Sequence, residues 1–293
     1  MYKEYFKKFN PSDHESIGFF IKNGYVQYEN VYDNDLISES RKFFFDFYSK
    51  LLNHSLTGEF DVDINGCAVS IINEFEKTSM YQSFIKTRNV IDIFKNFIGP
   101  DIAILGYDAL WINVPQDNDP VLLKGYHTDA WTGTSINTIF AKTFFTSVDE
   151  YNGMSVCPGS HLQGLIPTRN RKIDPLFNIK FDSFNLSNSK AGDFLIWHPL
   201  LIHSTTGHSD KNIRISLTSR FTSTETDFSS QERALGYKTI NVSPMNQILR
   251  LIGNDYLSPL RTYDGFVGID RRLSDIYEYS SYKKNRDYTP FLK

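Results

Sequence analysis

Residues 192–205 read GDFLIWHPLLIHST and residues 213–222 read IRISLTSRFT, and the polar segment GHSDKN (207–212) separates them. Both stretches are rich in β-branched and aromatic residues, which favour extended strands. The pattern predicts a hairpin of two antiparallel strands. Because cross-strand neighbours lie within side-chain reach, we expect His203, near the end of the first strand, and Arg214, near the start of the second, to line one pocket.

Two earlier stretches have the same character. DIAILGYDALWINVP (101–115) and TSINTIFAKTFFTSV (134–148) are also rich in strand-forming residues and are bounded by Gly, Pro, Asn and Asp. Several such strands without long helices between them predict an antiparallel sandwich or barrel. The expected fold class is therefore mainly β with flanking helices, and the barrel is expected over about residues 100–222.

The first hundred residues have helical patterns instead. Apolar residues recur at helical spacing through about 35–52, and a second helical region runs through about 70–98. We expect residues 1–222 to form one domain that includes this helical N-terminal region. Residues 223–293 are expected to form a C-terminal extension, either a lid over the pocket or a packing appendage.

The composition excludes several classes of protein. Over 293 residues, 31 basic and 34 acidic side chains leave a net charge of −3, whereas binding to nucleic acid needs a basic excess on one face. Two cysteines make no disulfide framework, which indicates a reducing compartment. No segment has the apolar length of a signal core or a membrane span. We therefore expect a cytoplasmic protein that binds neither nucleic acid nor membrane, and its oligomeric state stays open.

The segment GYHTD (125–129) carries two metal-binding side chains. In extended backbone His127 and Asp129 point to the same side, so an imidazole and a carboxylate converge. His-x-Asp alone is a weak signal because it occurs often by chance. With His203, however, it makes a set of two histidines and one carboxylate, which leaves open positions on Fe(II). The guanidinium of Arg214 suits a carboxylate bidentately, so a chelating dicarboxylate fits between the metal and Arg214.

In these motifs the chain resembles the phytanoyl-CoA dioxygenase family of Fe(II)/2-oxoglutarate oxygenases. That family has His-x-Asp, a distal His and an Arg about ten residues later, which match His127, Asp129, His203 and Arg214. Further matching motifs surround these residues: Asn23-Gly24-Tyr25-Val26, Asn152-Gly153, Cys157-Pro158-Gly159-Ser160-His161 and Gly192-Asp193. The resemblance covers about residues 15–222, and its specificity comes from several motifs in the right order.

The resemblance implies a double-stranded β-helix, which is a jelly-roll barrel, with the metal at its open mouth. It implies that His127, Asp129 and His203 bind Fe(II) and that Arg214 binds 2-oxoglutarate. It also implies the reaction, in which O2 and 2-oxoglutarate are consumed, a C–H bond of a small molecule is hydroxylated, and succinate and CO2 are released.

Other residues are expected to complete the pocket. Thr205 shares a face with His203 and can donate its hydroxyl to the distal carboxylate of 2-oxoglutarate. Asn113 and Lys124 lie upstream of His127, where the family has polar contacts to the ketoacid. Three tryptophans are either walls of the substrate pocket or core packing: Trp111, Trp131 and Trp197.

Two other functions share parts of this pattern. A metal-dependent hydrolase can use the same triad, although it has no need of Arg214. A non-catalytic jelly-roll ligand-binding protein would keep the fold without the reaction. Among oxidative outcomes Asp129 disfavours halogenation, which needs a small residue in place of this carboxylate. Arg220 is the rival of Arg214, because a spacing of six keeps both on one face of a strand. Nothing in the sequence selects the substrate.

Overall fold

The computed structural model describes residues 3–56, 64–105, 108–113, 125–148, 153–169, 172–174, 181–205, 213–226, 229 and 236–251. Lys124 and the polar segment 254–293 lie outside these residues. The expected cosubstrate contact of Lys124 and the expected role of the extension as a lid or appendage therefore stay predictions.

Helices dominate the first hundred residues, as their apolar spacing predicted. They are η1 (Lys3–Phe6), α1 (Glu15–Asn23), α2 (Asn34–Leu56), α3 (Ile64–Phe75), α4 (Ser79–Ile85) and α5 (Arg88–Ile98). The first long turn is set by Gly24, which ends α1 at a φ of 81°, a left-handed conformation that costs glycine little. The chain therefore enters the strand β2 (Tyr25–Tyr28) directly after Gly24.

The large sheet has eight strands. They are β1 (Lys8–Phe9), β2 (Tyr25–Tyr28), β3 (Ile102–Leu105), β4 (Ala109–Asn113), β5 (Ile139–Phe144), β10 (Phe194–Trp197), β12 (Arg214–Ser223) and β13 (Tyr237–Asn241). Their order is β1-β2-β10-β5-β12-β3-β13, and β4 pairs with β12. Only β1 and β2 pair in parallel among the strands described. Strand β12 is the centre of this sheet, because it pairs along one edge with β5 and along the other with β4 and β3.

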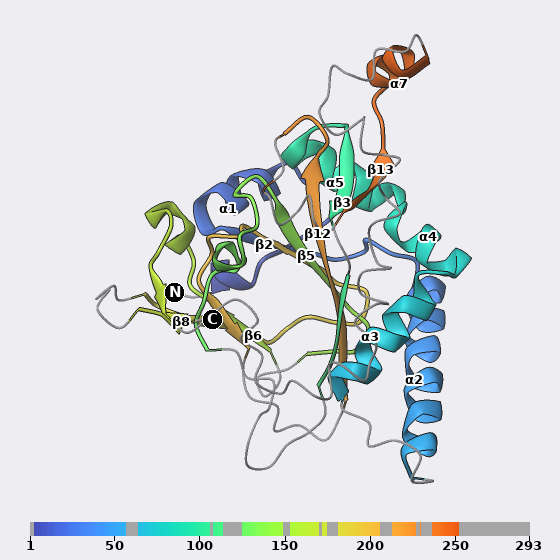
Figure 1. Cartoon of the computed structure of the whole chain (residues 1–293). Helices are drawn as coiled ribbons and strands as arrows, with labels where there is room; N and C mark the ends of the chain where they lie inside the picture. The colour runs from blue at the N-terminus through green and yellow to red at the C-terminus, as the bar shows by residue number, and fades with distance from the viewer. Residues whose placement is uncertain are drawn as a thin grey trace.

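A smaller sheet faces the large one. Its strands are β6 (Met154–Val156), β9 (Phe184–Leu186) and β11 (His203–Thr205), in the order β11-β6-β9. The remaining elements are η2 (Asp129–Thr132), η3 (Ser160–Gln163), the pair β7 (Thr168–Arg169) and β8 (Lys172–Ile173), and the helix α7 (Pro244–Leu251) that follows β13. Figure 1 shows α7 standing away from the sheets.

The predicted hairpin between 192–205 and 213–222 is wrong. Strand β11, which carries His203, pairs with β6 of the small sheet. Strand β12, which carries Arg214, pairs with β5, β4 and β3 of the large sheet. In a jelly roll, strands that are consecutive in sequence cross between two stacked sheets, so sequence neighbours need not be hydrogen-bonded partners.

Alternating side chains of the large sheet build two separate cores. From β5, β10 and β12, one face directs Ile139, Ala141, Phe194, Ile196, Ile215 and Leu217 toward the helices. The opposite face directs Phe140, Phe144, Leu195 and Trp197 toward Met154, Val156 and Leu186 of the small sheet. The molecule therefore has three layers, with helices α2, α3 and α4 on one side of the large sheet (Figure 1) and the small sheet on the other.

Two stacked sheets with flanking helices confirm the expected jelly-roll class. Among the described residues the strand ladders remain separate sheets and do not close into one hydrogen-bonded barrel. No helix in the described ranges combines the length and apolar character that crossing a membrane requires.

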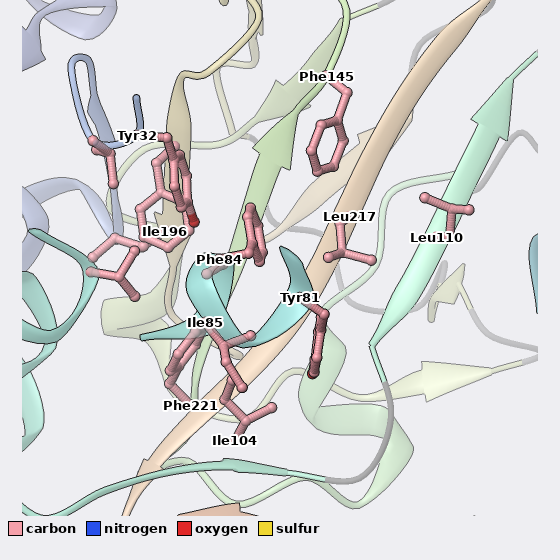
Figure 2. Packing of buried hydrophobic residues seen from close by; sticks show 14 of the residues in the cluster. Tyr32, Tyr81, Phe84, Ile85, Ile104, Leu110, Phe145, Ile196, Leu217 and Phe221 are labelled. Carbon is pink, nitrogen blue, oxygen red and sulfur yellow. The ribbon is translucent and has the colours of Figure 1, made fainter. Parts of the chain in front are cut away.

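The helix layer is held to the sheet by aromatic packing. In Figure 2, Tyr81 and Phe84 of α4 lie in the same cluster as Phe221 of β12. Phe94 of α5 stacks on Phe221, with ring centroids 3.8 Å apart and an interplanar angle of 16°. This contact joins α5 to the strand at the centre of the large sheet.

We expect Phe94→Ala to lower the free energy of unfolding by about 3–5 kcal/mol, because Phe94 is fully buried and its removal leaves a cavity. Urea titration should show a lower midpoint with an unchanged slope. The control Ile21→Ala, at a position 62% exposed, should change stability by less than about 0.5 kcal/mol. A loss below about 1 kcal/mol for Phe94→Ala would contradict the packing described here.

Candidate metal centre

The centre is built on a backbone pairing between His127 and His203. The amide of His127 donates to the carbonyl of His203 at 2.9 Å, and the amide of His203 donates to the carbonyl of His127 at 3.0 Å. This isolated antiparallel bridge places the two imidazole rings with their centroids 4.3 Å apart. Two ligands that lie far apart in sequence are thus neighbours on one edge of the small sheet.

Asp129 completes the group from the start of η2. Its carboxylate Oδ1 lies 3.9 Å from Nε2 of His127, and its Oδ2 lies 3.5 Å from Nε2 of His203. One ligand atom of each residue lies within 4.8 Å of the others. The three side chains therefore converge from one side, as a facial triad requires.

Both imidazoles are held in the tautomer that binds a metal. Nδ1 of His127 lies 2.7 Å from the carbonyl oxygen of Gly125, and Nδ1 of His203 lies 3.0 Å from that of Leu201. A carbonyl oxygen can only accept, so Nδ1 carries the proton and the Nε2 lone pair is available. Burial lowers the pKa of His203 to about 4, although the negative charge of Asp129 acts to raise it. The imidazole of His203 is therefore neutral at pH 7.

Trp197 contacts the carboxylate directly. Its indole N–H donates to Oδ2 of Asp129 at 2.8 Å, and its ring stacks on Phe140 with centroids 5.5 Å apart. The sequence suggested a pocket wall or core packing for Trp197. The structure adds a hydrogen bond from Trp197 to Asp129, a candidate metal ligand. Hydrogen bonds of this kind orient ligating carboxylates in metal sites. The even spacing of Trp197 and His203 was the only hint of it in the sequence.

Arg214 lies in the facing sheet and is anchored by Asn113. Its Nε and Nη2 donate to Oδ1 of Asn113 at 3.2 Å and 2.9 Å, and its Nη1 donates to the carbonyl of Gly153 at 3.1 Å. Residues 113 and 214 are register partners on adjacent strands, which explains the contact. Burial lowers the pKa of Arg214 to about 10, so the guanidinium is still charged at pH 7. The structure thus adds an anchoring contact for Asn113, whose expected contact to the ketoacid stays a prediction.

A cavity between the two sheets gathers these residues. Its lining includes the triad, Arg214, Asn113, Thr205 and all three tryptophans, and further contributions come from Ala109, Thr132, Phe140, Lys142, Met154, Thr218 and Arg220. Every site residue that the sequence predicted within the described part of the chain therefore lies at one cavity. Trp131 reaches it from the 3-10 helix η2.

The cavity also contains residues that the sequence did not single out, above all Lys142, Phe140 and Met154. Phe140 and Lys142 alternate on β5, so a shared face was predictable. Which face points inward depends on the position of the small sheet, and no local pattern in β5 contains that information.

The other described histidines do not join the triad. His198 lies beside His161 with ring centroids 5.5 Å apart and beside Phe20 at 6.5 Å. Burial lowers the pKa of His198 to about 4. The exposed His14 is the N-cap residue that precedes α1, and His208 lies outside the described residues. Two imidazoles, one carboxylate and an open cavity in front of them suit Fe(II), so the residues present fit this metal.

Comparisons with known proteins point to one family. The sequence profile described as "Phytanoyl-CoA dioxygenase (PhyH)" matches residues 20–216, which include the triad and Arg214. No match was found among curated proteins.

Solved structures of similar fold include three with TM-scores above one half. ThoJ, described as a non-heme monooxygenase, has a TM-score of 0.61 at 14% identity, with 78% of this chain and 84% of that chain covered. The epimerase SnoN, solved with Fe3+, alpha ketoglutarate and nogalamycin RO, has 0.57 at 16%, covering 73% and 85%. The alpha ketoglutarate dependent carbocyclase SnoK has 0.56 at 14%, covering 76% and 89%. Likeness at such low identity shows the shared fold.

Anaerobic Fe(II) binding tests the triad. We expect one Fe(II) per chain, measured by competition with a chromogenic chelator. Loss of a residue that hydrogen-bonds to a metal ligand typically weakens metal binding by ~10–100-fold. His203→Ala should weaken Fe(II) binding by more than this, because it removes a ligand itself. His14→Ala, at an exposed position, should bind like the wild type. Undiminished binding by His203→Ala would exclude His203 as a ligand.

Trp197→Phe tests the indole contact separately, because it keeps an aromatic ring at this position and removes the N–H donor. The loss of side-chain volume is the same as in the control variant Trp111→Phe. We expect Fe(II) affinity to fall by about 10–100-fold. Trp111→Phe is the matched control, since that indole lines the same cavity but donates to Oγ1 of Thr218 at 3.1 Å. Equal losses in the two variants would mean that the bond to Asp129 has no special role.

Proposed function

Because this chain belongs to the phytanoyl-CoA dioxygenase family of non-haem Fe(II)/2-oxoglutarate oxygenases, we propose that it hydroxylates a C–H bond of a small-molecule metabolite. Its cofactor is Fe(II), and its cosubstrates are 2-oxoglutarate and O2, with succinate and CO2 as products of the cosubstrates. Residues 1–222 are proposed to form the oxygenase domain, close to the span matched by the family profile.

The observation that supports this function best is the meeting of the triad and Arg214 at one cavity from two facing sheets. We assign the metal to His127, Asp129 and His203. Bound iron would supply the redox chemistry that couples decarboxylation of 2-oxoglutarate to oxidation of a C–H bond. The protein's own task is to orient the reactants, keep its ligands deprotonated and exclude water from the cavity.

Arg214 is proposed to hold the far carboxylate of 2-oxoglutarate. A buried guanidinium fixed by Asn113 and the carbonyl of Gly153 loses little rotational freedom when it binds, which favours a defined orientation of the ligand. Thr205 lines the same cavity and is proposed to donate its hydroxyl to this carboxylate. The opposite end of the ketoacid is then directed toward the triad.

Hydroxylation is proposed over other oxidative outcomes for a chemical reason. Proteins of this fold are described as a monooxygenase, an epimerase and a carbocyclase, so the fold leaves the outcome open. Asp129 keeps the carboxylate ligand that halogenation would have to lose. Aromatic side chains around the cavity favour a small substrate with an apolar body.

The 2-oxoglutarate contact is tested with Arg214→Leu. Loss of a bidentate, charge-assisted contact should cost roughly 2–3 kcal/mol, or about 30–150-fold in affinity. The weak visible charge-transfer band of the chelated ketoacid gives the binding curve. Arg220→Leu should show a much smaller loss, and the reverse order would assign the contact to Arg220.

Succinate release distinguishes the proposed enzyme from a hydrolase or a ligand-binding protein with the same triad. The Fe(II)-loaded protein should convert 2-oxoglutarate to succinate, slowly alone and faster with a substrate from pooled metabolites. Metal and 2-oxoglutarate binding without any succinate would overturn the proposal.

A further inference from the structure

We propose that the substrate of this site carries an anionic group, a carboxylate or a phosphate, and that Arg220 binds it. This inference rests on the proposed function, because it assumes that 2-oxoglutarate occupies the Arg214 end of the cavity. The inference specifies the chemical class of the substrate, which the fold alone does not determine.

Arg214 begins β12, and Arg220 lies six positions later on the same face of this strand. Both line the cavity, and six positions of an extended strand span roughly 20 Å. Arg214 is paired across from Asn113 on β4, whereas Arg220 is paired across from Phe140 on β5. A five-carbon dicarboxylate that reaches from the metal to Arg214 cannot also contact Arg220. The second guanidinium is therefore available to another ligand.

Aromatic stacking directs Arg220 toward the centre of the site. Its guanidinium carbon lies 5.4 Å from the centroid of the Phe140 ring, and Phe140 stacks on Trp197. Trp197 in turn donates to Asp129 of the triad. A guanidinium that stacks through its face keeps its in-plane N–H groups for a planar oxyanion. Arg220 is thus placed to hold one end of a molecule whose other end lies near the metal.

The balance of charge in the cavity favours an anion. The described lining contains three cations, Lys142, Arg214 and Arg220, and a single carboxylate, Asp129. Asp129 is committed to the proposed metal, and the two carboxylates of 2-oxoglutarate are accounted for by that metal and Arg214. The charge of Arg220 is left to attract an anionic substrate.

Asp108 is an acidic residue that interacts electrostatically with Arg220 and is not among the residues that line the cavity. The hydroxyl of Tyr81 donates to its Oδ2 at 2.6 Å, and burial raises the pKa of Asp108 while Ser219, Tyr81, Lys238 and Arg220 oppose that rise. Within the described part of the chain, no hydrogen bond or ion pair joins Arg220 to Asp108 or to another acid. The charge of Arg220 is therefore not taken up by an ion pair with an acid of the described chain, and its side chain lines the cavity.

The remaining walls indicate the body of the substrate. Trp111, Trp131, Phe140 and Met154 line the same cavity as Arg220 and the triad. Such walls bury an apolar or aromatic body, while the cation fixes one polar end. The expected substrate is a compact apolar or aromatic molecule with one anionic group.

The test uses benzoate and phenyl phosphate as anionic probes and benzamide as a neutral probe of similar shape. Binding is followed anaerobically by tryptophan fluorescence with Fe(II) and saturating 2-oxoglutarate, since all three tryptophans line the cavity. At least one anionic probe should bind saturably, and benzamide should bind at least tenfold more weakly. Arg220→Leu should weaken binding of that anion by about 30–150-fold.

Two variants control this experiment. Arg220→Lys keeps the charge without the planar fork and should lose less affinity than Arg220→Leu. Arg88→Leu removes an arginine whose side chain is 92% exposed, and it should bind the anion like the wild type. If Arg220→Leu does not fold, as judged by circular dichroism, Arg220→Gln takes its place because it retains a polar side chain of similar reach.

The proposal is overturned if Arg220→Leu binds the anion as tightly as the wild type, or if benzamide matches both anions. The tighter of the two anionic probes identifies the oxyanion, and either preference supports the proposal. The same titrations without Fe(II) and 2-oxoglutarate separate this inference from the proposed function. Anion binding at Arg220 would then persist even if 2-oxoglutarate failed to bind or to yield succinate.

Discussion

The reciprocal backbone pairing of His127 with His203 is the constraint on which the rest of the site depends. Two residues that exchange both amide–carbonyl bonds are held about 5.5 Å apart at their Cα atoms, whatever their side chains do. The pairing therefore presents two imidazoles together, and the carbonyls of Gly125 and Leu201 then fix which nitrogen faces the cavity. Asp129 follows His127 by only two residues, and its carboxylate lies close to both imidazoles. A metal site built in this way is rigid before any metal arrives.

The inner face of the large sheet is divided between packing and chemistry. Phe144 and Leu195 pack on the small sheet and belong to the core between the sheets. Arg214, Lys142 and Arg220 line the cavity and keep charges inside the fold, where an uncompensated charge is costly. Hydrogen bonds from Arg214 to Asn113 and Gly153 reduce that cost, and bound anions would reduce it further. The separation of the two arginines along β12 provides two distinct anion positions in one cavity.

Much of this arrangement could be predicted from the sequence. His127, Asp129, His203 and Arg214 were recognisable because their types and order carry a specific chemistry. The helical first hundred residues and the β-rich remainder followed from periodicity, which reflects local burial. The hairpin of 192–205 with 213–222 was a reasonable expectation that failed, because strand pairing in a jelly roll is set by sheet crossing and not by sequence proximity.

By itself, then, the sequence determined the composition of the candidate metal centre, the family and the mainly β architecture, since side-chain chemistry and alternation are local properties of the chain. Only the tertiary structure decided that Trp197 donates to Asp129, that Asn113 anchors Arg214, and that Phe140, Lys142 and Arg220 face the cavity. These contacts join residues from different strands or different sheets. Their geometry depends on which face of each strand meets the opposite sheet, and that follows from the packing of the whole domain.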